Sequence, residues 1–316
     1  MLIFASGRTD IPAFYSEWFM KRIRAGYVDV RNPYFPEQVS RYRLAPDAVD
    51  CLVFCTKNPR PMIPFIGELR ARGFGVYFFV TITPYGRDIE PGVPDKHQLL
   101  SSFRELSDSL GSGCVCWRYD PIFVSSKYSC EYHERAFSAM SDELKGKTER
   151  CIISFIDLYK KTLRNFSGVT EVSESQQRLL AERFGKIGAG RGIRIETCAE
   201  RIDLSAYGIA QGACISRSVI EQACRIKIVR NPGVQRLRSA CACLPLSDIG
   251  AYNSCPHLCR YCYANYDAAL VKKNVARHRP DSSFLLGDAA AGDKTHRARQ
   301  QSLRDTASEA QPLLGL

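Results

Sequence analysis

The sequence predicts an α/β protein built on a parallel sheet, as a complete or partial TIM-like barrel or as an open, doubly wound sheet. Apolar runs rich in β-branched and aromatic residues recur along the first 200 residues, and a helix-like segment follows each run. Strands that alternate with helices form a parallel sheet with helices packed outside it. The expected strands are residues 2–6, 51–55, 75–82, 114–118, 151–156 and 193–197.

Apolar residues at helical spacing predict helices over 95–110, 130–145 and 173–187. Asp95 with Gln98, and Ser173 with Gln176, are suitable N-terminal caps for the first and last of these helices. We interpret the aromatic and methionine stripes of these segments as core.

The 316 residues allow one large or two ordinary domains, and 45% hydrophobic residues supply ample core. We expect a barrel core over 1–200 and a cysteine-rich segment over 201–287 that completes the barrel. Residues 288–316 are rich in Ala, Gln, Asp, Arg and Ser and have little to bury, which predicts a disordered tail.

The chain begins without a basic leader and has no apolar run of about 20 residues, so we expect a cytoplasmic protein that does not cross a membrane. Fourteen cysteines in such a protein favour metal ligation over disulfides. The net charge of +11 suits an anionic ligand such as a nucleotide, a phosphate ester or nucleic acid, although a basic solvated surface explains it equally well.

The most distinctive stretch is the C-x3-C-x2-C run formed by Cys255, Cys259 and Cys262. Thiolates at this spacing can point inward from one loop and bind a 4Fe–4S cluster. Three ligands leave one iron open, which indicates a reactive rather than a purely structural site. The alternatives are a zinc site, which usually has four ligands in paired dyads, and scattered buried cysteines.

A second metal site is a further hypothesis, because four more cysteines could close an auxiliary iron–sulfur cluster or hold zinc. Its candidate ligands are Cys198, Cys214, Cys241 and Cys243. Buried free cysteines are the alternative, since cysteines within strands behave as small hydrophobes.

Polar side chains follow each predicted strand, and in a parallel barrel these strand ends meet at one mouth. The polar groups nearest the ends include Ser6, Lys57, Thr81, Thr83 and Glu196. They also include Arg8, Asp10, Arg118 and Asp120, of which Arg118 and Asp120 could equally form a structural ion pair.

Residues 29–48 contain three X-Pro pairs, which predict a long loop or a short hairpin lying over the barrel. The arginines and aromatic residues of this segment could hold a planar anionic ligand, or the segment could be a solvated loop with packed aromatics.

Several motifs together resemble a known family. They are Ser6-Gly7-Arg8-Thr9-Asp10-Ile11-Pro12-Ala13-Phe14-Tyr15, Val30-Arg31-Asn32-Pro33, Thr56-Lys57-Asn58-Pro59, Trp117-Arg118-Tyr119-Asp120-Pro121 and the closing cysteine run. The match from residue 1 to about 287 resembles a bacterial family known only as a domain of unknown function. That family has C-terminal cysteines like those of radical S-adenosylmethionine (SAM) enzymes.

More distantly, the order of motifs is similar to a permuted spore photoproduct lyase, with the cluster loop moved to the end. The resemblance implies that Ser6 to Asp10 lie beside the amino group of SAM. It places Lys57 and Thr81 or Thr83 at the carboxylate or ribose, and Tyr261 or Tyr263 near the adenine. Arg8, Asp10, Arg118, Asp120 and Glu196 are then candidates for substrate and SAM contacts.

The resemblance implies a radical SAM enzyme in which a 4Fe–4S cluster cleaves SAM to a 5′-deoxyadenosyl radical. The expected partners are a small-molecule or nucleotide substrate, with nucleic acid as a further option, and a reducing protein such as flavodoxin or ferredoxin. Two alternatives remain open: a non-catalytic iron–sulfur protein that transfers electrons or acts as a sensor, and a zinc-stapled nucleic-acid-binding protein.

Overall fold

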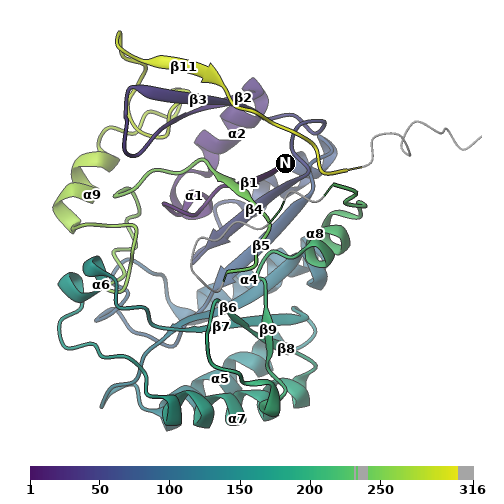
Figure 1. Cartoon of the computed structure of the whole chain (residues 1–316), viewed down its shortest axis with the longest axis vertical. Helices are drawn as coiled ribbons and strands as arrows, with labels where there is room; N and C mark the ends of the chain where they lie inside the picture. The colour runs from purple at the N-terminus through teal and green to yellow at the C-terminus, as the bar shows by residue number, and fades with distance from the viewer. Residues whose placement is uncertain (231–232, 234–240, 305–316) are drawn as a thin grey trace, which may run out of the picture.

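The computed structural model describes residues 1–230, 233 and 241–304. Its centre is an eight-stranded, entirely parallel sheet (Figure 1) with the strand order β10-β1-β4-β5-β6-β7-β8-β9. The strands are β1 (Leu2–Phe4), β4 (Cys51–Thr56), β5 (Val76–Thr81), β6 (Val115–Ile122), β7 (Arg150–Phe155), β8 (Arg194–Cys198), β9 (Ala210–Gly212) and β10 (Leu246–Asp248).

The strand order from β1 to β9 follows the chain, apart from an inserted hairpin, and β10 adds beside β1. The α/β class and the parallel sheet are therefore confirmed. In the hydrogen-bonded order, β9 and β10 are the outermost strands of the sheet. Closure into a barrel stays a prediction.

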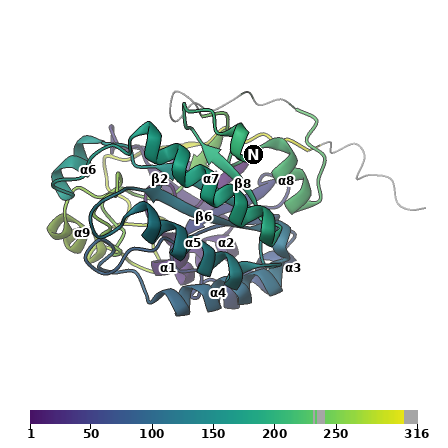
Figure 2. The same cartoon turned by 90° about the horizontal axis from the view of Figure 1, so that it is seen from below.

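Helices cover one face of this sheet, and Figure 2 shows α4, α5 and α7 side by side across it. The helices of the described chain are α1 (Ile11–Phe14), α2 (Ser16–Ala25), α3 (Ile66–Ala71), α4 (Lys96–Leu110), α5 (Cys130–Leu144), α6 (Lys160–Asn165), α7 (Glu174–Arg191), α8 (Arg217–Cys224) and α9 (Ala268–Val275). Asp95 caps α4, and Ser173 with Gln176 forms a capping box on α7, as the sequence predicted.

The core beneath these helices consists of alternate residues of each strand. Trp117 of β6 stacks on Phe137 of α5, and Phe137 stacks on Phe184 of α7 at a centroid distance of 4.0 Å. The strand residues between them point to the opposite face, where α8 packs. Because both faces are covered, the strands are nearly continuous apolar runs, and this is why they could be recognised in the sequence.

Residues 29–48 contain most of a hairpin, which was one of the two predicted forms. Strands β2 (Tyr27–Arg31) and β3 (Gln38–Arg43) pair antiparallel, and β11 (Lys294–Arg297) joins β3 to make a separate three-stranded sheet. Arg31 pairs with Asp293 and lies over the ring of Phe284, 4.4 Å from its centroid. These contacts fix the hairpin to the C-terminal segment.

The expectation of a disordered tail from residue 288 is wrong for residues 288–304. Pairing with β3 supplies the backbone hydrogen bonds of β11, so that segment needs few buried side chains of its own. Leu303 is buried, and its amide donates to Asp50. Residues 305–316 of the predicted tail, and 231–232 and 234–240 of the predicted cysteine-rich segment, lie outside the described residues.

No helix within the described residues combines the length and the apolar character that crossing a membrane requires.

Candidate functional site

The loop of residues 253–265, which carries the C-x3-C-x2-C run, lies against the segments that follow the carboxyl ends of β1 and β5. Three hydrogen bonds dock it there. The Arg260 amide donates to the carbonyl of Ile89 at 3.0 Å, and the Gly92 amide donates to that of His257 at 2.9 Å. The Tyr15 hydroxyl donates to the Ser254 carbonyl at 2.6 Å. Residues more than 150 positions apart in the chain are thus held together.

The three thiols of this loop occupy a desolvated site. Cys259 is buried, and Cys255 and Cys262 are half-buried. Burial raises the pKa of all three, and the proximity of the other two thiols raises the pKa of Cys255 further. Cys262 Sγ accepts the amide of Ala264 at 3.3 Å. A positive charge is therefore needed nearby if these groups are to be thiolates.

Asp10 ties the loop to two strand ends. It caps α1 through the amide of Ala13 at 3.0 Å, and its other oxygen accepts the Lys57 amide at 2.8 Å. The same oxygen is 3.0 Å from Nε2 of His257, inside the cysteine run. Asp10 thus has three partners from three segments, which makes it a positioning residue for the loop.

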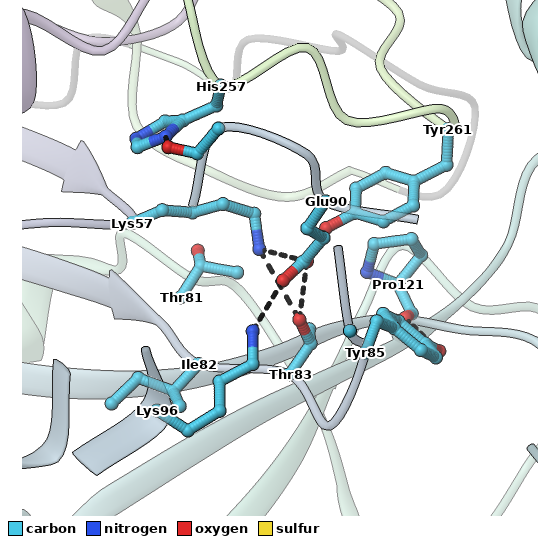
Figure 3. Close-up of polar contacts among 12 residues, drawn as sticks. Lys57, Thr81, Ile82, Thr83, Tyr85, Glu90, Lys96, Pro121, His257 and Tyr261 are labelled. Atoms are coloured by element: carbon cyan, nitrogen blue, oxygen red, sulfur yellow. Dashed lines mark hydrogen bonds and ion pairs between the residues drawn. The ribbon is translucent and has the colours of Figure 1, made fainter. Parts of the chain in front are cut away.

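A buried ionic network lies beside the cysteines (Figure 3). Glu90, only 1% exposed, accepts from Lys57 at 2.7 Å, Lys96 at 2.6 Å and the Thr83 hydroxyl at 2.6 Å. The Tyr261 hydroxyl, from the cysteine loop, also donates to Glu90. One carboxylate therefore joins the ends of two strands, the start of α4 and the loop.

The electrostatics of this network favour its charged form. Burial alone would raise the pKa of Glu90, but the charges of Lys57 and Lys96 outweigh it and lower that pKa to about 2. Burial lowers the pKa of Lys57, and the attraction of Glu90 and of the Cys259 thiol raises it more, so the net direction is upward. Lys57 is thus a cation whose charge acts on the Cys259 thiol.

A second polar group lies on the face of the sheet that faces away from α4, α5 and α7. Arg118 of β6 pairs with Asp120, donates to Cys55 Sγ at 3.6 Å and lies over the Phe79 ring. The Thr81 hydroxyl is 3.9 Å from the same sulfur. Burial lowers the pKa of Arg118, but Asp120 and Cys55 raise it more strongly, so it remains a cation.

Arg8 lies in the segment that follows β1 and donates to the Asp248 carbonyl at 2.7 Å. Its Nε is 3.3 Å from the Asp248 carboxylate, and its guanidinium lies 5.8 Å from the Tyr252 ring centroid. The hydroxyl of Ser6 is buried and has no hydrogen-bond partner among the described residues. Ser6 is therefore available to a ligand.

Glu196 of β8 forms an ion pair of its own. Its carboxylate pairs with Arg150 at 2.5 Å, and Arg150 also donates to the Tyr77 hydroxyl at 3.0 Å. Glu196 is the middle residue of β8 rather than a residue at its carboxyl end. That it contacts substrate stays a prediction.

The second set of cysteines comes together in part. Cys198 and Cys214 form a disulfide, whereas Cys241 and Cys243 are free thiols. The preference for metal ligation over disulfides therefore does not hold for this pair in this structure, since strand pairing brings its Cα atoms to 6.1 Å, within disulfide range. Among the described residues, no three His, Cys, Asp or Glu side chains are grouped so that they could hold a metal ion as they stand.

Three residues of the site were missed by sequence reasoning: Glu90, Lys96 and His257. Glu90 lies in the segment Ile89-Glu90-Pro91-Gly92, and nothing in that pattern distinguishes a buried acid from a solvated one. Lys96 is the first residue of a helix, where a lysine is usually solvated. His257 could have been predicted, because it lies inside the cysteine run itself.

A comparison with curated proteins and one with solved structures returned no match. A comparison with protein-family models matched residues 2–264, which is most of the chain, and it is this match that shows the family. The chain belongs to the family described as "Domain of unknown function (DUF1848)".

Proposed function

We propose that this protein is a radical SAM enzyme whose site lies where the loop of residues 253–265 meets the strand ends. The observation that carries the proposal is the placement of three cysteines of one loop beside the fixed cation of Lys57. Catalytic groups of parallel α/β proteins gather at the carboxyl ends of strands. The parallel sheet supports the finer proposal of a partial barrel with its cluster loop at the C-terminal end of the fold.

By ligand type and number, the three cysteines of the loop suit a 4Fe–4S cluster. Cys255, Cys259 and Cys262 would supply three thiolates from one loop, and Lys57 would offset part of their charge. The amide of Ala264 already donates to Cys262 Sγ, and such N–H···S bonds stabilise thiolate ligands. When bound, a three-cysteine cluster supplies an open iron that can hold SAM and the electron that cleaves it.

The remaining residues would bind and orient. Ser6 offers a buried hydroxyl that has no hydrogen-bond partner among the described residues, and Thr81 offers another polar contact on the face of the sheet that carries Arg118. Arg118 and Asp120 present paired charges there, suited to a polar substrate that carries an anionic group. Lys57 and Thr83 act through Glu90, which holds them in place rather than leaving them free for a ligand.

The substrate class remains a small molecule or nucleotide that carries negative charge, and the electron would come from a flavodoxin- or ferredoxin-like protein. The net charge of the chain, +11, supports both an anionic substrate and an acidic protein reductant, because the opposite charge would attract each of them to the protein. A non-catalytic iron–sulfur protein or a zinc protein that binds nucleic acid would lack SAM cleavage.

The test uses full-length protein purified without oxygen and reconstituted with iron and sulfide. Dithionite and SAM are added, and 5′-deoxyadenosine is quantified. The wild type and a Cys130→Ala control should produce it, because Cys130 lies on α5, outside the loop. Cys259→Ala should produce none. Cleavage that survives this substitution would refute the assignment of the loop.

A further inference from the structure

We propose that the surface formed by α6 and the two ends of the cysteine loop binds a single strand of nucleic acid. This surface, called here the tyrosine–cation surface, consists of Tyr159, Tyr252, Tyr263, Tyr266, Lys161 and Arg164. Binding at this surface does not require SAM cleavage.

Exposed aromatic side chains concentrate at this surface. Seven aromatic side chains among the described residues are exposed, and four of them are the tyrosines named above, each 36–51% exposed. A fifth, Phe14, has its ring centroid 4.6 Å from that of His257, inside the cysteine loop. The other two, Tyr34 and Phe35, lie at the turn between β2 and β3. Exposed apolar groups that gather in one place indicate an interaction surface.

Helix α6 holds these residues together by packing against the loop. The Thr162 hydroxyl donates to the Tyr261 carbonyl at 3.3 Å, and the Asn165 side chain donates to the Tyr266 carbonyl at 3.1 Å. Tyr159, directly before the helix, has its ring centroid 6.3 Å from that of Tyr263. Figures 1 and 2 both show α6 on the same side of the molecule as α9, which follows the loop. The four tyrosines therefore belong to one surface, although they come from two segments of the chain.

The cations of α6 lie over these rings. The Arg164 guanidinium is 3.9 Å from the ring centroid of Tyr266, and the Lys161 ammonium is 4.9 Å from that of Tyr252. Within the described part of the chain, neither cation forms an ion pair with a carboxylate. By contrast, Arg178 of α7 pairs with the glutamate four positions before it. The positive charge of α6 is therefore available to an anionic ligand.

Rings and unpaired cations side by side are what a single strand of nucleic acid requires. Its bases stack on aromatic side chains, and its phosphates bind Lys and Arg. One base has two faces, so a mononucleotide could use at most two of the four rings, whereas a strand presents successive bases. In a duplex the base faces are already stacked, and an acidic peptide offers charge without a base to stack. The net charge of +11 adds long-range attraction for phosphates.

The surface borders the cysteine loop. Tyr263 directly follows Cys262, and its hydroxyl donates to the Gly7 carbonyl, in the segment after β1. A strand bound to these tyrosines would pass beside the loop.

The test measures binding with full-length protein in the absence of SAM and reductant. Fluorescence anisotropy at low salt follows a labelled single-stranded thymidine oligonucleotide of about 12 nucleotides. An abasic strand of the same length and a duplex are compared with it. We expect the thymidine strand to bind at least about fivefold more tightly than the abasic strand, because stacking of even one base contributes that factor. Equal affinity for the abasic strand, or tighter binding of the duplex, would overturn the proposal.

Variants then locate the binding surface. Tyr252→Ala/Tyr266→Ala should weaken binding at least about fivefold, whereas Tyr252→Phe/Tyr266→Phe keeps the rings and should retain the affinity. The matched control is Tyr34→Ala/Phe35→Ala, which removes two exposed rings at the hairpin and should leave binding unchanged. A control that weakens binding as much as the first variant would refute this location.

The salt dependence tests the cations separately. Lys161→Gln/Arg164→Gln should lower the slope of log affinity against log salt by about 1.4, since each lost phosphate contact removes about 0.7. Tyr252→Ala/Tyr266→Ala should keep the slope of the wild type. An unchanged slope in the Lys161→Gln/Arg164→Gln variant would contradict the role of α6. Because no SAM is present, a protein that cannot cleave SAM can still pass this test, and a failure here leaves the cleavage assay of Cys259→Ala unaffected.

Discussion

Substitution of Glu90 by Gln tests the buried ionic network most sharply. The change keeps the size of the side chain and removes its charge, leaving Lys57 and Lys96 without their carboxylate. Removing one partner of a buried ion pair costs about 3–5 kcal/mol, because an uncompensated charge remains. The pKa of Glu90, lowered from 4.5 to about 2, independently corresponds to about 3 kcal/mol. We therefore expect a loss of about 3–5 kcal/mol in unfolding free energy.

Glu68→Gln is a matched control. Glu68 also pairs with two cations, Arg24 and Arg72, and its pKa is likewise lowered to about 2, mainly by its hydrogen bonds to them. The pair lies at the surface, however, where water and salt screen the charges. The expected loss there is below about 1 kcal/mol.

Urea unfolding, followed by far-UV circular dichroism with metal-free protein of each variant, measures both losses. Replacing Lys96 by Met in the Glu90→Gln background should recover part of the stability, because one of the two unpaired charges then disappears. If Glu90→Gln were no more destabilising than Glu68→Gln, the account of a buried, charged network would be refuted.

Three further predictions concern the Glu90 network, the docking of the cysteine loop and the pairing of β11. The folded pKa of Glu90 lies below its unfolded value, so the stabilisation that Glu90 contributes is present above about pH 4.5 and is lost as the pH falls toward 2. The difference in unfolding free energy between wild type and Glu90→Gln should therefore shrink over that pH range. A difference that does not change with pH would contradict this. Tyr261→Phe removes the hydroxyl that donates to Glu90, and it should lower the unfolding free energy by about 1.5–3 kcal/mol. It should also speed hydrogen exchange at the Arg260 amide, which docks the loop. Unchanged exchange would count against this docking. Truncation after residue 287 removes β11 and should lower the melting temperature by several degrees, as read by calorimetry; an unchanged melting temperature would show that the strand adds no stability.

The central strands and long helices could be predicted because burial on both faces makes each strand a recognisable apolar run. Apolar runs identified β4 and β7, and the spacing of Ser173 and Gln176 identified the cap of α7. Strands β9 and β10 have three residues each, too few for a pattern to form. Strand β11 is four exposed residues whose only structural signal is a partner more than 250 positions away.

The candidate site was predictable where a motif carries the chemistry and unpredictable where tertiary contact does. The cysteine run and Lys57 follow from spacing and from a strand end. Glu90 acquires its role only when two lysines and a tyrosine close around it, which no local pattern encodes. The strand of Glu196 was located to within one residue, but its partners Arg150 and Arg194 became evident only in the structure.

Iron and sulfide content together with 5′-deoxyadenosine formation, measured on the same oxygen-free preparation, tests the central claim most directly. The account predicts a cluster on Cys255, Cys259 and Cys262 and SAM cleavage that Cys259→Ala abolishes. Protein that contains zinc and no inorganic sulfide at this loop, or a reduced cluster that leaves SAM intact, would contradict it.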